Sequence, residues 1–375
     1  MLDGSGYFLY HSIGMFPGKA TRVAAALADV ATLWGTPDDA QWPRSLAIKR
    51  QFLDHWHRLI GAPPGTMTTA ENVTTALYSV IGALPDRYLR GRQILIAADC
   101  FPSLHFLLSG MAQRRGFELV TVPTRAGESW VRDEDFIARW GPEVGVALLT
   151  WVTSTASHRC DLGAMAAHGR QRGSLLGIDI TQGIGIVPFG LAGADADFLV
   201  ASSLKWLCGV AGAGVLQVRE QLLRECRPEL RGWFSQENPF SWALDRFEYA
   251  ADARRFDHGT PSFLACAASL PGLEWHAQQD PAALRSHNQR LVEALMRGCE
   301  TFGLALASPR RAGERGGSVM FKLPAGRHAA EVIATLRQQQ VFVDARGDTL
   351  RFSPGNLTTM DGVERLLRDL RASLR

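Results

Sequence analysis

The 375-residue chain is long enough for one large domain and a smaller one, and its hydrophobic content of 46% can form a sizeable core. Its 40 basic and 37 acidic residues give a net charge of +3 without a concentrated basic stripe, which argues against a nucleic-acid partner. No apolar stretch approaches ~18 residues, and Asp3 stands where a signal peptide would be basic, so we expect a cytoplasmic protein without a membrane partner.

Cysteine and histidine spacing predicts neither a disulfide framework nor a metal site. The six cysteines lie far apart without a C-x-x-C pair, so we expect them to be reduced. His55 and His57 are two residues apart and would point to different faces of a helix. We therefore expect no metal.

From residue 72 onward, helical and strand patterns alternate. The apolar spacing of Val73, Leu77 and Val80 predicts a helix, and the strands that follow are apolar throughout. Such strands, separated by helices, indicate a mainly parallel sheet covered on both faces, and hence an α/β fold. The expected helices are 72–84, one that carries Leu104, Leu107, Leu108 and Met111, 132–140 and 160–173, and the expected strands are 93–98, 117–122, 144–152, 174–179, 197–203 and 211–220.

The C-terminal part of the chain changes character. Its order of elements suggests a small α+β domain over residues 256–375, beside a large α/β domain over 15–255 and joined by the N-terminal segment 1–14. The expected elements are helices at 281–303, 329–340 and 360–375, and strands at 318–323, 341–345 and 350–354.

Lys205 is an unusual residue in this sequence. Only four lysines occur among the 40 basic residues, and "SSLKWL" places this one at the end of a buried strand. Lysine, unlike arginine, can lose its proton and form an imine. The alternative is a lysine whose stem lies along apolar surface while its ammonium group reaches water.

Other marked residues follow neighbouring strands, where ligands bind in parallel α/β sheets. Asp179 closes one strand, Phe101 follows another, and Thr153 and Ser154 follow a third. The segment 72–75, "NVTT", begins a helix whose free N–H groups can bind an anion. Taken singly, the carboxylate could cap a loop, the phenylalanine could belong to the core, and "NVTT" could be an ordinary helix cap.

Together these residues match the needs of pyridoxal 5′-phosphate. A lysine can form an imine with the aldehyde, a carboxylate can keep the pyridine nitrogen protonated, an aromatic ring can stack on the heterocycle, and a helix start can hold the phosphate. A protonated ring is an electron sink for a carbanion at the substrate Cα. We therefore expect this cofactor and a small-molecule substrate that is an amino acid.

The sequence resembles the fold-type I pyridoxal-phosphate enzymes of the class V aminotransferase superfamily, and within them it is most similar to kynureninase. The resemblance runs nearly end to end. It rests on "YFLYHSIGMFP" (7–17), "CFPSLHFLL" (100–108), "GIDITQGIGIVP" (177–188), "SSLKWLCGVAGAG" (202–214), "RGWFSQ" (231–236), "RRFDHGTPSFLACAASLPGLEW" (254–275) and "LRFSP" (350–354).

The resemblance implies roles for individual residues. Lys205 would carry the cofactor as an internal aldimine and then act as general base, and Asp179 would hold the pyridine nitrogen. Thr260 would reach a phosphate in a neighbouring subunit, which implies a homodimer with shared sites. Further cofactor contacts would come from Val73, Thr74, Phe101, Gln182, Ser202 and Trp233, and substrate contacts from Arg351, Ser12 and His11, with Arg351 clamping the α-carboxylate.

Several positions depart from the kynureninase pattern. Leu204 replaces a tyrosine, Leu104 an aspartate, Gly259 an asparagine found in some kynureninases, and Gln182 and His11 a histidine and an asparagine. A kynureninase-like hydrolase or related β-lyase is the favoured reading, with a class V aminotransferase as the alternative. A catalytically inactive cofactor-binding homologue is the non-enzyme alternative. Cysteine desulfurase chemistry is disfavoured because "SPRRAGERGGSVM" (308–320) contains no cysteine.

Overall fold

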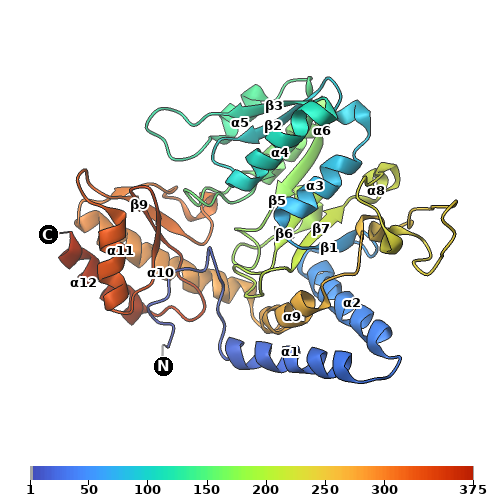
Figure 1. The fold of residues 1–375 in the computed structure, drawn as a ribbon. Coiled ribbons are helices and arrows are strands. Elements are labelled where there is room, and N and C mark those ends of the chain that lie inside the picture. The colour runs from blue at the N-terminus through green and yellow to red at the C-terminus, as the bar shows by residue number, and fades with distance from the viewer. Residues whose placement is uncertain (1–2, 375) are drawn as a thin grey trace.

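The computed structural model describes residues 3–374 (Figure 1). Residues 1, 2 and 375, at the outer ends of the predicted N-terminal segment and the last predicted helix, lie outside this range. A seven-stranded sheet forms the centre of the larger part, and a four-stranded sheet with its own helices lies beside it. Within residues 3–374, no helix is both long and apolar enough to cross a membrane.

The large sheet has the strand order β1-β7-β6-β5-β4-β2-β3. β7 runs antiparallel to both of its neighbours, and the other adjacent pairs are parallel. The predicted mainly parallel sheet is therefore confirmed. The strands are β1 (Met67–Ala70), β2 (Gln93–Ala97), β3 (Glu118–Val122), β4 (Val144–Thr150), β5 (Leu175–Asp179), β6 (Phe198–Ser202) and β7 (Gly214–Val218).

Helices cover both faces of this sheet. Along β2, Ile94 and Ile96 pack into one apolar cluster, whereas Leu95 packs into another on the opposite face. Because successive strand residues point to opposite faces, a strand between two cores must be apolar throughout. The helices are α1 (Lys19–Gly35), α2 (Gln41–Ile60), α3 (Val73–Ala83), α4 (Pro102–Arg115), α5 (Asp133–Arg139), α6 (Leu162–Arg172), α7 (Leu191–Ala194), α8 (Glu220–Glu225) and α9 (Phe263–Ala277), with short 3₁₀ turns η1 (Asp86–Tyr88), η2 (Trp233–Ser235) and η3 (Ala253–Phe256).

Local capping chemistry explains where two of the predicted helices begin and end. The Asn72 side chain accepts a hydrogen bond from Thr75 N, which starts α3. Asp161 caps α6 in the same way, and Gly173 ends it in a left-handed conformation with φ of 67°. The cap at Asn72 starts α3 where the sequence predicts it. The end of α6 at Gly173 lets β5 begin at Leu175, as the sequence also predicts.

The small sheet has the order β10-β11-β9-β8, and an apolar cluster joins it to its helices. The N-terminal segment belongs to this unit: Phe8 lies in its core, Tyr7 bridges Phe342, and Leu9 bridges Ser353. The elements are α10 (Pro281–Thr301), β8 (Ala305–Leu306), η4 (Ala312–Glu314), β9 (Val319–Lys322), α11 (Ala329–Gln338), β10 (Asp344–Arg346), β11 (Thr349–Phe352) and α12 (Met360–Ser373).

Two N-terminal helices were not identified from the sequence. α1 and α2 lie at the lower edge of the large part in Figure 1 and pack against α9. The predicted domain boundary at residue 256 stays a prediction, and these contacts favour a boundary nearer the start of α10.

Candidate active site

Lys205 lies in a turn directly after β6. Ser203 anchors this turn because its backbone N–H and its hydroxyl both donate to Ala213 O, at 3.1 and 2.5 Å. On the other side, Gly14 N donates to Leu204 O at 2.9 Å. The N-terminal segment therefore holds the turn that carries the lysine.

The protein around Lys205 makes its ammonium form less favourable. Loss of hydration lowers the pKa of Lys205 from 10.5 to about 8, against the opposing effect of the Asp179 carboxylate, and the Arg351 guanidinium lowers it further. A large fraction of the amine is therefore neutral near pH 8. The neutral form of the amine is the one that can react with an aldehyde.

Asp179 ends β5 and is buried. Burial raises its pKa, while Thr181 and Lys205 act in the opposite direction. The backbone N–H and the hydroxyl of Thr181 both donate to Oδ1, at 2.9 and 2.5 Å. This arrangement orients the carboxylate and leaves Oδ2 for another donor, such as a protonated ring nitrogen.

Phe101 faces Lys205. Its ring centroid lies 5.4 Å from Lys205 Nζ, and 45% of the residue is exposed. A core phenylalanine would be buried, so the core interpretation is wrong for this residue. An accessible aromatic face beside a reactive amine suits the stacking of a planar heterocycle.

The start of α3 provides an anion site. Asn72 and Thr75 form a capping box that uses the Thr75 N–H. The N–H groups of Val73 and Thr74, in the first turn, have no carbonyl partner within the helix. Thr74, Thr75 and Thr260 line one cavity of about 510 Å³, which suits a phosphate at the helix terminus.

Arg351 is 4% exposed, so the alternative of a surface residue on an edge strand is wrong. Its Nη1 donates to Ser154 O at 2.9 Å, and its Nη2 donates to the Asp344 carboxylate. Arg351 Nε is buried without a hydrogen-bond partner among the described residues. The guanidinium is thus aligned by two partners, and Nε is its one nitrogen without a partner among the described residues.

His11 completes this polar cluster. Its Nε2 lies 3.1 Å from Asp344 Oδ2, and its Nδ1 lies 2.7 Å from Ser353 Oγ. Burial lowers the pKa of His11 to about 4, so the ring is neutral at pH 7. Burial disfavours ionised Asp344, but its hydrogen bonds with His11 and Arg351 outweigh this effect and hold its pKa well below the usual range.

The remaining predicted residues occupy varied positions. Gln182 is buried and donates to His11 O at 3.1 Å, and Ser202 is buried at the end of β6. Ser12 is exposed in the N-terminal segment. Trp233 packs edge-on against Trp42 with a centroid distance of 5.4 Å. The cofactor and substrate roles assigned to these four residues stay predictions.

Sequence reasoning gave no role to two participants, Asp344 and Gly14. Asp344 pairs with Arg351 across the β10–β11 hairpin, and a Cβ at Gly14 would lie 1.7 Å from Lys205 O. The turn signal "RGD" (346–348) could have placed the hairpin and so revealed the contact of Asp344 with Arg351. The contact between Gly14 and Lys205 joins distant segments, and no local sequence signal predicts it.

The residues described fit pyridoxal 5′-phosphate. The set comprises an amine of lowered pKa, a carboxylate with one free oxygen, an exposed aromatic face and a helix N-terminus beside threonine hydroxyls. Each group comes from a different strand end or helix start, as expected for a ligand bound at the carboxyl edge of a parallel sheet.

Comparisons with known proteins identify the family to which the chain belongs. Residues 50–373 match the profile of the family described as aminotransferase class-V. A kynureninase of Deinococcus radiodurans is 30% identical over 366 residues, covering 94% of this chain and 84% of that protein. An isopenicillin N epimerase of Streptomyces clavuligerus is 27% identical, covering 85% of this chain and 83% of its own length.

Solved structures share the fold. A cysteine desulfurase from Thermococcus onnurineus has a TM-score of 0.86 at 18% identity, covering 97% of this chain and 93% of that one. A cystine C–S lyase, solved with cysteine persulfide, has a TM-score of 0.87 at 20% identity, covering 98% and 97%. The predicted fold-type I architecture and the predicted cofactor, pyridoxal 5′-phosphate, are confirmed, and the chain belongs to the aminotransferase class-V family.

Proposed function

We propose that this protein is a kynureninase-like enzyme that cleaves the Cβ–Cγ bond of an α-amino acid by hydrolysis, or performs the related β-lyase reaction. The observation that carries this proposal is the buried Arg351, held by the Ser154 carbonyl and by Asp344, in the same site as the Lys205 amine. An arginine held in this way suits recognition of a substrate α-carboxylate. The likeness to kynureninase over 94% of the chain supports the same reading.

The chain's own residues can divide the work of such a reaction. Bound pyridoxal phosphate supplies an electron sink for the negative charge that develops at the substrate Cα. Lys205, once its amine is free, accepts the Cα proton, for which a pKa near 8 is well matched. Asp179 Oδ2 would keep the ring nitrogen protonated, and the Arg351 guanidinium would bind the substrate carboxylate.

Two alternatives keep support of their own. Leu104 is buried in the apolar core of the large domain, where the kynureninase pattern has an aspartate. An uncharacterised aminotransferase of Bacillus subtilis is 24% identical over 88% of this chain. A class V aminotransferase is therefore the second candidate, and a catalytically inactive cofactor-binding homologue is the third.

Cysteine desulfurase activity finds no support in this chain, although solved desulfurases share its fold. All six cysteines are buried, and burial raises the pKa of each thiol. A nucleophilic cysteine needs the opposite environment, partly exposed and with a lowered pKa.

A panel of amino acids that includes kynurenine tests the proposal, with and without a keto-acid acceptor. Formation of alanine and an aromatic amine without the acceptor is the expected result. Acceptor-dependent turnover would favour the aminotransferase, and no turnover of any substrate would favour the inactive homologue. Lys205→Ala is the inactive control.

Arg351→Ala should raise KM by about tenfold or more, because each lost charged hydrogen bond contributes ~1.5–3 kcal/mol.

We also propose that the protein acts in the cytoplasm as a homodimer. In this proposal the Thr260 hydroxyl contributes to the phosphate end of a site that two subunits share. The position of Thr260 in the cavity at the α3 N-terminus is consistent with a phosphate ligand.

A further inference from the structure

An apolar cavity of about 290 Å³ lies between the N-terminal segment and the small domain. Tyr7 and Met15 line it from the segment, and Phe342 and Leu357 line it from the small domain. Backbone hydrogen bonds hold the two sides together, since Phe342 N donates to Gly6 O at 2.9 Å. Sites for small molecules are mostly apolar hollows of ~300–1,000 Å³, so this cavity can hold one compact ligand.

A carboxylate and a guanidinium also line this cavity, from Asp3 and Arg365. The hydroxyl of Ser5 lies between them: it donates to Asp3 Oδ1 at 2.8 Å and accepts from Arg365 Nη2 at 2.9 Å. Within residues 3–374, neither charged group forms an ion pair, and Arg365 Nε is buried without a hydrogen-bond partner. Two opposite charges therefore lie close together at one cavity without neutralising each other by direct contact.

We propose that this cavity binds one free α-amino acid with an apolar side chain. Its α-carboxylate would pair with Arg365, and its ammonium group would pair with Asp3. Its side chain would lie among Tyr7, Met15 and Phe342, where burial of apolar surface favours binding and a polar side chain would lose hydration. A carboxylic acid without an amine would meet the charge of Asp3, and an amine without a carboxylate would meet that of Arg365. The pair of charges therefore selects a zwitterion.

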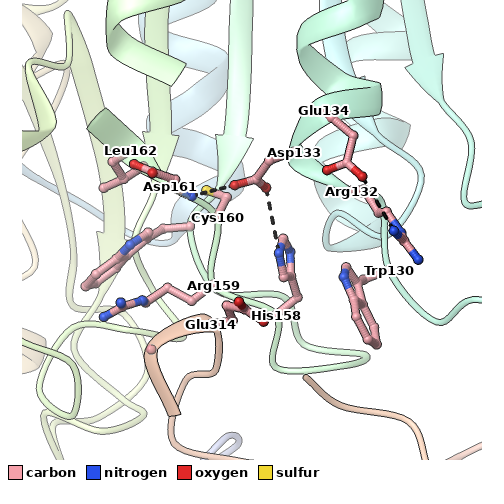
Figure 2. Close-up of a pocket in the computed structure, with 12 residues that line it drawn as sticks. Trp130, Arg132, Asp133, Glu134, His158, Arg159, Cys160, Asp161, Leu162 and Glu314 are labelled. Carbon is pink, nitrogen blue, oxygen red and sulfur yellow. Dashed lines mark hydrogen bonds and ion pairs between the residues drawn. The ribbon is translucent and has the colours of Figure 1, made fainter. Parts of the chain in front are cut away.

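A second cavity, of about 770 Å³, is less suited to this ligand (Figure 2). Figure 2 shows the Asp133 carboxylate between His158 and the backbone of Asp161, whose N–H donates to it at 2.7 Å. Two guanidinium groups line this cavity against four carboxylates, so a ligand carboxylate would meet an excess of negative charge. These groups belong to Arg132, Arg159, Asp133, Glu134, Asp161 and Glu314.

Occupancy of the smaller cavity would stabilise the contact that holds the lysine turn. Met15 directly follows Gly14, whose N–H donates to Leu204 O beside Lys205. An amino acid in contact with both Tyr7 and Met15 would join two points of the N-terminal segment and restrict its movement. The described residues that line the cavity include no lysine, cysteine or histidine, so its role is regulatory rather than catalytic. This role does not depend on which reaction the enzyme catalyses.

Equilibrium dialysis of L-phenylalanine against the borohydride-reduced holoenzyme tests the proposal. Reduction fixes the cofactor to Lys205, so the amino acid cannot displace that amine in the active site. We expect saturable binding of one equivalent per chain that depends on both charged groups. Arg365→Gln should raise the dissociation constant by about tenfold or more, because it removes a charged hydrogen-bond donor. Asp3→Asn, at an exposed residue, should raise it by about threefold.

Arg368→Gln is the matched control. Arg368 lies on the same helix, α12, but it is exposed, pairs with Asp369 at 3.2 Å and does not line the cavity. Its replacement should leave the dissociation constant unchanged. Loss of binding in this variant equal to that in Arg365→Gln would contradict the assigned site.

Two analogues of the probe test the selection of a zwitterion. 2-Phenylethylamine lacks the carboxylate and should bind at least about tenfold more weakly than L-phenylalanine, and 3-phenylpropionate lacks the ammonium group and should bind at least about threefold more weakly. If the acid bound as tightly as the amino acid, the cavity would be a site for acids and the proposal would be wrong.

Amide hydrogen exchange locates the bound amino acid. We expect L-phenylalanine to slow exchange in residues 3–15 and in the lysine turn, 203–208. Protection confined to 130–134 and 158–161 would place the ligand in the cavity of Figure 2 and overturn the proposal. Binding that neither Arg365→Gln nor Asp3→Asn weakens, or no saturable binding, would also overturn it. Because none of these measurements records turnover, such a result would leave the proposed reaction unaffected.

Discussion

At the scale of single residues, the site depends on how its neighbours alter Lys205. Burial removes hydration from the amine, and the Arg351 charge acts in the same direction. Asp179 opposes both effects, yet its own Oδ1 is already engaged by Thr181. The Lys205 amine can therefore be neutral near pH 8 while it stays close to Asp179, the carboxylate that we expect to bind the pyridine ring.

This balance predicts how cofactor incorporation depends on pH. Because the pKa of Lys205 in the folded protein is about 8 rather than 10.5, the neutral amine increases as pH rises through 8. The rate at which cofactor-free protein incorporates pyridoxal phosphate, followed by visible absorbance, should therefore rise with a midpoint near pH 8. Arg351→Gln removes a positive charge and should move the midpoint upward by roughly half a pH unit or more.

The control for this measurement is Arg346→Gln, which removes an exposed arginine whose guanidinium bonds the other oxygen of Asp344. It should leave the midpoint within about 0.2 pH unit of the unaltered protein. A midpoint that stays near pH 10, or one that falls in Arg351→Gln, would contradict the account of Lys205.

At the scale of elements, the N-terminal segment joins the small domain to the lysine turn. Its strand-like bridges at Tyr7 and Leu9 hold it on the small sheet, while Gly14 contacts the turn after β6. Lys19 reinforces this contact by donating to Gly14 O at 2.7 Å and Gly209 O at 2.9 Å. Movement of this segment would therefore move Lys205.

Gly14→Ala tests this contact. The added Cβ would lie 1.7 Å from Lys205 O, so either the segment or the lysine turn must move. We expect a loss of ~1–3 kcal/mol in the free energy of unfolding and a lower cofactor occupancy. Gly35→Ala is the matched control because a Cβ there meets nothing within 4 Å. Equal behaviour of the two variants in urea unfolding would show that the segment adapts freely.

A second link between elements is the buried ion pair of Lys49 and Asp257. Lys49 Nζ on α2 lies 2.5 Å from Asp257 Oδ2, and Thr68 on β1 donates to the other carboxylate oxygen. Lys49→Met leaves the carboxylate buried and unpaired, which should cost ~3–5 kcal/mol of unfolding free energy. Adding Asp257→Asn should recover part of that loss, and a double-mutant cycle measures how much.

Lys322→Met, at a half-buried lysine on β9, controls for general effects of the substitution and should cost less than about 1 kcal/mol. Additive losses in the cycle would mean that Lys49 and Asp257 do not stabilise one another.

At the scale of the whole molecule, the sequence predicts those parts that local patterns encode. The apolar strands and the capped helices α3 and α6 carry strong local signals, and they place Asp179, Phe101 and Lys205 at one edge of the sheet. The Asp344–Arg351 contact depends on hairpin register, which the turn geometry sets and composition does not reveal. α1 has few buried residues, so its helical pattern is weak as a core signal.

An exposed apolar loop indicates where two copies of the chain would associate. The loop between η2 and η3 exposes Phe240, Trp242 and Leu244, of which Trp242 is 86% and Leu244 99% exposed. In a monomer, exposed aromatic and aliphatic side chains in one short loop would leave apolar surface in unfavourable contact with water. Such a group of side chains is typical of a protein–protein interface. Because the proposed role of Thr260 requires a neighbouring subunit, we predict that a second copy covers this loop.

Light scattering of the holoenzyme should therefore give twice the chain mass of 41.0 kDa. Trp242→Arg combined with Leu244→Asp should raise the dimer dissociation constant by at least about a hundredfold, since each loses apolar burial worth ~1.5–3 kcal/mol. Met360→Arg, at a 40% exposed apolar residue on α12, should leave the mass unchanged.

If Thr260 serves the partner's site, cofactor retention should fall together with dimerisation in the loop variant, because a monomer lacks the hydroxyl that the second chain supplies. A monomeric holoenzyme with full cofactor occupancy would contradict both the interface and the shared site.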